Sequence, residues 1–70
     1  MEVYYMQLTL REKDVCKCII EGMSNTEIAD FLYLSKHTVK SYVGQIIAKT
    51  RVKNRTQLAY LLGKENIIQM

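Results

Sequence analysis

The chain has 70 residues, about half of them apolar and a quarter charged, with a net charge of +3. A chain this short forms a single domain with a thin core, and its lack of proline and its three glycines favour helices over a sheet built from tight turns. No apolar run approaches the ~18 residues that a membrane span needs, which argues against a membrane protein. No set of residues assembles a catalytic site, which argues against an enzyme.

The first predicted helix begins after residues 1–7, which we interpret as an N-terminal arm, with the domain proper over residues 8–70. Thr9 and Glu12 form a capping box at its start, and Gly22 suits a left-handed cap at its end. The predicted apolar stripe consists of Val15, Cys16, Ile19, Ile20 and Met23. Cys16 and Cys18 lie roughly 200° apart on such a helix, so they can neither bridge nor share a metal, and we expect two small buried side chains.

The second predicted helix begins only two residues later, because Ser24 and Glu27 repeat the capping box. It is short and should bury Ile28, Ala29 and Leu32. The turn falls at residues 33–34, and Ser35 caps the next helix.

The third predicted helix covers about residues 36–50 and has two different faces. The residues expected to point inward are Val39, Tyr42 or Val43, Ile46 and Ile47. Those expected to point outward are Lys36, His37, Lys40, Ser41, Gly44 and Gln45. Asn54 caps the fourth helix, with Gln57 at its third position, and that helix should end near Gly63 or Lys64.

The charges divide between the two halves of the chain. Residues 1–35 carry three basic and six acidic side chains, whereas residues 36–70 carry seven basic and one acidic. Between Lys36 and Lys64 there is no carboxylate, and a polyanion would relieve the resulting repulsion.

The second and third helices, joined by a short turn, should cross steeply, with Ala29 where their backbones approach. The third helix then projects as a ridge that fits the ~12 Å major groove of DNA. Gly44 inside a helix costs about 1 kcal/mol, which close approach to a groove wall or to another helix would explain. The start of the second helix offers backbone N–H groups to a phosphate. We therefore predict binding of double-stranded DNA.

Four motifs, T-x-R-E, E-G-x-S-N-x-E-I-A, L-S-x-x-T-V-K and V-x-x-R-T-Q, occur between Leu8 and about Leu62. In these the chain resembles the LuxR/GerE-type helix-turn-helix domains. The resemblance implies an all-α, four-helix fold of the winged-helix-like superfamily without the wing. It also implies a sequence-specific regulator of bacterial transcription in the cytoplasm, at the nucleoid. Its implied partners are double-stranded DNA, a second copy of the chain and RNA polymerase, with no cofactor, metal, small-molecule ligand or membrane.

The resemblance also assigns roles to residues. Glu12 should be an inward-facing structural acid and Leu58 a core residue, while Ala59 and Tyr60 on the fourth helix are candidates for a twofold dimer contact. With the positions argued above, the predicted DNA-binding set is Asn25, Thr26, Lys36, His37, Thr38, Lys40, Ser41, Gly44, Gln45 and Lys49.

Three departures from the family pattern stand out. Leu10 replaces a proline, Tyr42 a histidine, and Thr50 with Arg51 a Leu-Gly pair. We expect either backbone strain at Arg51 or an extension of the third helix. The family's usual sensor domain is missing from these 70 residues, so we expect a freestanding regulator or an excised effector domain.

Two alternatives remain beside a DNA-binding regulator of this family. The promoter-element-binding region of sigma factors shares the L-S-x-x-T-V-K-S pattern, but it usually has glycine near Tyr33 and lacks the V-x-x-R-T-Q entry. A protein–protein interaction module that has lost DNA binding is the other alternative, and the retained lysines argue against it.

Overall fold

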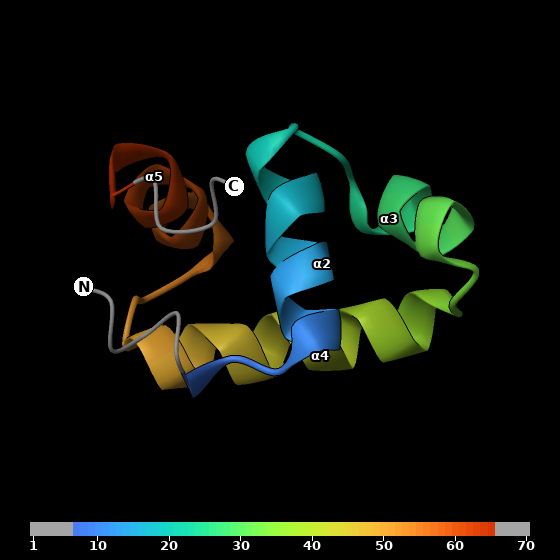
Figure 1. Ribbon diagram of the computed structural model, residues 1–70, viewed down its shortest axis with the longest axis horizontal. Coiled ribbons are helices and arrows are strands. Elements are labelled where there is room, and N and C mark those ends of the chain that lie inside the picture. Colours follow the sequence, from blue (N-terminus) through green and yellow to red (C-terminus); the bar gives the residue numbers. More distant parts are fainter. Residues whose placement is uncertain (1–6, 66–70) are drawn as a thin grey trace.

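The computed structural model describes residues 7–65, which contain four helices and no strand (Figure 1). They are α2 (Leu10–Ile20), α3 (Asn25–Leu32), α4 (Lys36–Thr50) and α5 (Arg55–Glu65). The predicted all-α helix-turn-helix fold is thereby confirmed. Of the predicted arm, residues 1–6 lie outside the described part of the chain. Within that part, no helix has the length and apolar character needed to cross a bilayer.

Helix α2 occupies the centre of the domain. It packs against α3, α4 and α5, and Figure 1 shows it standing on the long α4 with α3 to one side and α5 to the other. Because it is enclosed on several sides, both of its cysteines are buried although they point in different directions. The expected burial of Cys16 and Cys18 is confirmed, whereas the predicted stripe was wrong at Ile20, which is exposed.

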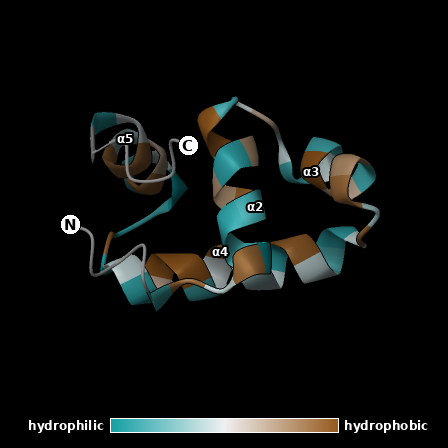
Figure 2. Ribbon diagram, viewed as in Figure 1, coloured by the Kyte–Doolittle hydropathy of each residue, from teal (hydrophilic) through white to brown (hydrophobic). Residues whose placement is uncertain are grey.

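The core is formed by one cluster of apolar side chains from all four helices. Each helix is amphipathic, with hydrophobic and hydrophilic residues interleaved along it (Figure 2). Burial of a Val, Leu or Ile contributes about 1.5–3 kcal/mol. The buried members are Leu8, Val15, Cys16, Cys18, Ile19, Ile28, Ala29, Val39, Val43, Ile46, Leu58 and Leu62.

The predicted caps of the first two helices are confirmed. In α2, Thr9 Oγ1 accepts from the Glu12 N–H at 3.1 Å and Glu12 Oε1 accepts from the Thr9 N–H at 2.8 Å. Ser24 and Glu27 repeat this exchange in α3, at 3.2 and 2.8 Å. Both helices therefore begin with satisfied donors and a carboxylate next to the positive end of the helix dipole.

The cap of α5 forms with one difference. Asn54 Oδ1 accepts from the Gln57 N–H at 2.9 Å, as predicted. Gln57 Oε1, however, accepts from the N–H of Lys53, at 3.0 Å, rather than from the cap residue itself. The glutamine thus also orders the segment before the helix.

The end of α2 is closed by the glycine predicted for it. Gly22 has φ +86, and its N–H donates to the Ile19 carbonyl at 3.0 Å. The N–H of Met23 donates to the Cys18 carbonyl at 3.1 Å, which completes a Schellman motif.

Among residues 7–65, two residues other than glycine adopt the left-handed conformation, Tyr33 (φ 60) and Arg51 (φ 61). Arg51 follows the last residue of α4, and its N–H donates to the Ile47 carbonyl at 2.9 Å. Of the two outcomes predicted for this position, strain is the one observed. A side chain in this conformation costs on the order of 1 kcal/mol.

Arg51→Gly should raise the free energy of unfolding by about 1 kcal/mol, because glycine adopts positive φ without the cost of a Cβ atom. For a domain of this size the melting temperature should rise by about 4–8 °C. Lys53→Gly removes the same charge from an exposed residue without positive φ, so it should not stabilise. Thermal unfolding followed by circular dichroism compares the two variants. An Arg51→Gly variant no more stable than the wild type would contradict the strain at this position.

Candidate nucleic-acid interface

The α3–α4 unit has a connection of three residues, 33–35. Tyr33 reverses the chain in the left-handed conformation, and the N–H of Leu34 donates to the Ala29 carbonyl at 2.9 Å. Ala29 is buried at the position predicted for the close approach of the two helices. Ser35 Oγ then accepts from the Thr38 N–H at 3.0 Å and starts α4. The turn is thus fixed by backbone and cap hydrogen bonds on both sides.

Helix α4 buries one face and leaves the other open. Val39, Val43, Ile46 and Thr50 are buried at spacings of four, three and four residues. Tyr42 and Ile47 are half-buried beside this face. Of the two residues predicted as alternatives for the inward position, Val43 is therefore the one that points into the core. Tyr42 lies at the edge of the buried face.

All residues predicted for the outward face of α4 are exposed. They are Lys36, His37, Lys40, Ser41, Gly44 and Gln45. Thr38 differs from them because it is half-buried and belongs to the cap, where its Oγ1 accepts from Ser35 Oγ at 2.9 Å. Since that oxygen acts as an acceptor, the Thr38 hydroxyl hydrogen is still available for donation.

The start of α4 violates the charge preference that α2 and α3 follow. Those two helices each have a glutamate in the first turn, whereas the first turn of α4 has no acid and begins with Lys36. A cation at the positive end of a helix dipole is unfavourable, by about 0.3–1 kcal/mol. An anion at this end would remove the conflict, and donors of this reach match phosphates and base edges.

Gly44 lies in the middle of α4, where no contact within the domain requires a glycine. A Cβ atom added there would meet nothing within 4 Å, so close packing against another part of residues 7–65 does not explain it. The approach of Gly44 to the wall of a DNA groove stays a prediction.

The start of α3 is tied to the start of α5. Arg55 donates from Nη1 to Asn25 Oδ1 and from Nη2 to the Met23 carbonyl, the latter at 2.5 Å. Asn25 is half-buried, and Thr26 next to it is exposed. Arg55 was not among the predicted site residues, although the R-T-Q entry contains it. It fixes the helix end whose first-turn N–H groups were predicted to bind phosphate.

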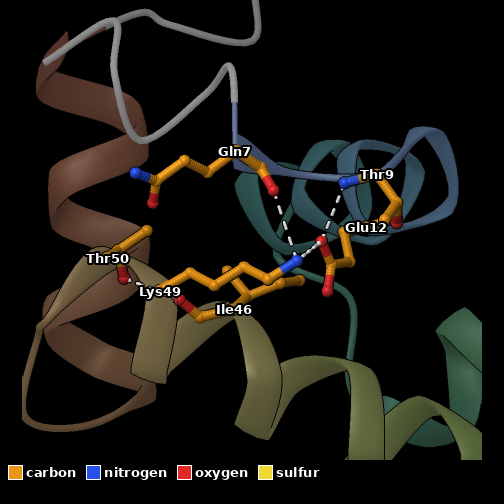
Figure 3. Close-up of polar contacts among 6 residues, drawn as sticks. All are labelled: Gln7, Thr9, Glu12, Ile46, Lys49 and Thr50. Atoms are coloured by element: carbon orange, nitrogen blue, oxygen red, sulfur yellow. Dashed lines mark hydrogen bonds and ion pairs between the residues drawn. The ribbon is translucent and has the colours of Figure 1, made fainter.

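Lys49 stands apart from the exposed set. Its Nζ donates to Glu12 Oε1 at 2.7 Å and to the Gln7 carbonyl at 3.3 Å (Figure 3). The Glu12 side chain is only 1% exposed, which confirms the predicted inward-facing structural acid. The structure thus brings Lys49 together with the cap of α2 rather than with the outward face of α4.

Two opposing effects act on the pKa of Glu12. Burial by itself raises it, but the hydrogen bonds from Lys49 and Thr9 and the charge of Lys49 more than offset this, so the pKa lies below its ordinary value of 4.5. The carboxylate is therefore ionised at neutral pH and forms a charged pair with Lys49.

The cysteines are shielded. Burial, followed by the charge of Glu12, raises the pKa of Cys16 to about 12. Burial, with the charges of Asp14 and Glu21, also raises the pKa of Cys18. Both stay protonated at neutral pH, which fits the predicted role of small core residues. Over residues 7–65, no group of three or more His, Cys, Asp or Glu residues is arranged to hold a metal ion.

The two residues of α5 predicted for a dimer contact, Ala59 and Tyr60, differ in their exposure. Leu58 is fully buried, as expected, and Ala59 is half-buried. Tyr60 is 68% exposed, with the Lys64 ammonium 5.7 Å from the centre of its ring. An exposed aromatic beside a cation is a suitable contact for a partner surface.

Comparison with known proteins gives a consistent result. Residues 6–62 match the family model described as bacterial regulatory proteins, luxR family. The chain is 49% identical over 63 residues to the uncharacterized transcriptional regulatory protein YhcZ of Bacillus subtilis strain 168, covering 90% of this chain and 29% of that protein. It is 38% identical over 65 residues to the response regulator protein VraR of Staphylococcus aureus strain Mu3, covering 93% and 31%. It is also 38% identical over 63 residues to the probable transcriptional regulator ycf29 of Porphyra purpurea, covering 90% and 30%. The chain therefore spans about 30% of the length of these curated relatives.

Glu12→Gln should lower the free energy of unfolding at pH 7 by about 2 kcal/mol, because the charged hydrogen bond to Lys49 is lost in a buried place. The folded-state pKa is lowered, so this contribution is present above pH 4.5 and disappears as the pH falls through the folded pKa. The difference between variant and wild type should shrink accordingly. Glu27→Gln is the control, since Glu27 holds the same capping-box position but is exposed. Urea unfolding at pH 7 and near pH 3 measures the difference, and an equal loss at both pH values would argue against a charged pair.

Proposed function

The chain belongs to the luxR family of bacterial regulatory proteins, and from that membership we propose that it is a sequence-specific, double-stranded DNA-binding transcriptional regulator. The family consists of regulators rather than enzymes. The match over residues 6–62 also favours this family over the sigma-factor alternative. Such a protein acts on the chromosome in the bacterial cytoplasm.

The proposal is carried by the acid-free, lysine-bearing start of α4. Lys36 lies in the first turn of α4 and Lys40 one turn later, and both are exposed. Positive charge at a helix N-terminus is unfavourable in the isolated domain but becomes favourable beside a phosphate backbone. We therefore assign α4 to the major groove. Lys36 and Lys40 then contact phosphates or guanines, while His37, Ser41 and Gln45 face base edges.

A second anchor is assigned to the start of α3. Its exposed Thr26 and the first-turn N–H groups suit a phosphate, and the Arg55 contact to Asn25 holds this end in place. Phosphate contacts of this kind set the orientation of α4 in the groove and carry no sequence information themselves.

The functional unit is proposed to be a homodimer on DNA through α5, with Tyr60 and Ala59 at the twofold contact. One small module buries too little surface for tight specific binding, so two copies would bind half-sites about one helical turn apart. The exposed ring of Tyr60 supports this choice of helix.

Lys40→Ala should weaken binding to a duplex selected from random sequences by ~1–3 kcal/mol. Lys17→Ala is the matched control, because it removes the same charge from an exposed lysine on α2, away from α4, and should change the binding free energy by less than about 0.5 kcal/mol. Titrations at several salt concentrations should give an affinity that falls steeply with salt and two chains per selected duplex. If no duplex binding is found even at low salt, the chain would instead be interpreted as a protein–protein interaction module that has lost DNA binding.

Gly44→Ala should stabilise the fold by up to about 1 kcal/mol and yet weaken DNA binding, since the new methyl group is free in the protein but would meet a groove wall. Gly63→Ala in α5 is the control, because a Cβ atom there is also unobstructed. It should stabilise the fold without a loss of affinity per bound chain. Thermal unfolding and duplex binding of both variants are compared. Unchanged binding by Gly44→Ala would place this part of α4 away from the DNA.

A further inference from the structure

A shallow depression lies between α2 and α3. It has a volume of about 400 Å³ and is lined by Asp14, Lys17, Cys18, Glu21, Met23 and Phe31. A second depression of about 370 Å³ shares Met23 and Phe31 with it and continues to Glu27 and Asp30. We call the two together the α2–α3 groove.

The groove is formed by two facing stripes. Asp14 and Cys18 of α2 and its C-cap residue Glu21 follow at spacings of four and three residues, and on α3, Glu27 and Asp30 are three apart. Helical periodicity therefore places each stripe on one side of its helix. Met23, in the connection between the helices, joins the two stripes.

An aromatic side chain is exposed at the centre of this groove. Phe31 is 63% exposed and lines both depressions, whereas Ile28 and Ala29 of the same helix are buried. Exposed aromatic residues with an apolar surround are the typical anchors of protein–protein contacts. Phe31 does not contribute to the core, so contact with a partner protein would explain an aromatic side chain at this exposed position.

The rim of the groove is acidic. Four of the chain's seven carboxylates, Asp14, Glu21, Glu27 and Asp30, line it, against one lysine, Lys17. Among residues 7–65, neither Glu21 nor Asp30 forms a side-chain ion pair or hydrogen bond. A rim of this sign repels nucleic acid and attracts a cationic segment.

The groove and the exposed face of α4 are accessible together. Helices α2 and α3 both pack on α4, and they do so against its buried face, from which Val39, Val43 and Ile46 point into the core. Figure 1 shows both helices on one side of α4. An occupant of the groove therefore leaves the opposite face of α4 open.

We propose that the α2–α3 groove is a docking site for a segment of another protein that carries an apolar side chain flanked by lysine or arginine. The apolar side chain lies against Phe31 and Met23, and the flanking cations pair with the carboxylates of the rim. The charge of the rim and the exposed Phe31 select this occupant.

The test uses the 70-residue chain, labelled with ¹⁵N, and a synthetic helical peptide of about 15 residues, with leucines on one side and lysines and arginines flanking them. Its counterpart has glutamate at each basic position. The basic peptide should shift the amide signals around Met23 and Phe31 and bind at least about tenfold more tightly than the acidic one. Its affinity should fall as salt is added.

Variants distinguish the groove from a general attraction of charges. Phe31→Ala and Glu21→Lys should each weaken peptide binding by about tenfold or more, and both replace exposed residues, so the fold is kept. Leu10→Ala, an apolar residue of α2 that is exposed but outside the groove, should leave binding unchanged. Binding insensitive to Phe31, equal binding of both peptides, or shifts confined to α4 and α5 would overturn the proposal. So would self-association that depends on Phe31, because the occupant would then be a second copy of this chain.

Discussion

The carboxylate of Glu12 joins three parts of the chain, and the arrangement of the helices depends on it. One of its oxygens accepts from the N–H of Thr9, which starts α2, and from the ammonium of Lys49, which lies near the end of α4. Lys49 in turn donates to the carbonyl of Gln7 ahead of the cap. A buried carboxylate without these partners would be costly, so the contact fixes which end of α4 lies beneath the start of α2. Between residues 7 and 65, α3 and α5 also pack against α2, so the contact orients a helix that both of them touch.

This contact also determines which basic residues of α4 remain exposed. Lys49 is used inside the domain, and the exposed cations of the helix are left toward its other end, at Lys36 and Lys40. Four other acids, Asp14, Glu21, Glu27 and Asp30, line the groove that contains Phe31. A domain with a net charge of +3 thus has a basic ridge and an acidic groove on different faces. The overall charge conceals this division, which determines what each face can bind.

Local features of the fold could be predicted from the sequence, and long-range partners could not. The caps at Thr9, Ser24 and Asn54 involve residues three apart, so a short stretch contains all that is needed. The partners of Lys49 and Arg55 lie 37 and 30 residues away, and nothing near either residue indicates them. For this reason the contacts of Lys49 with Glu12 and of Arg55 with Asn25 were not predicted. The exposure of Ile20 escaped prediction, because the apolar stripe of α2 was drawn one residue too wide.

The local costs of the fold are concentrated at α4 and its ends. Tyr33 before the helix and Arg51 after it both take positive φ without being glycine. The first turn contains Lys36 where α2 and α3 contain glutamate, and Gly44 weakens the middle without relieving any contact. By contrast, α2 and α3 follow the rules of capping and charge throughout their first turns. Sequences that specify a fold are consistent across levels, and departures from consistency gather where function requires them. These departures support the proposal that α4, held on a framework of more regular helices, gains its missing stabilisation from bound DNA.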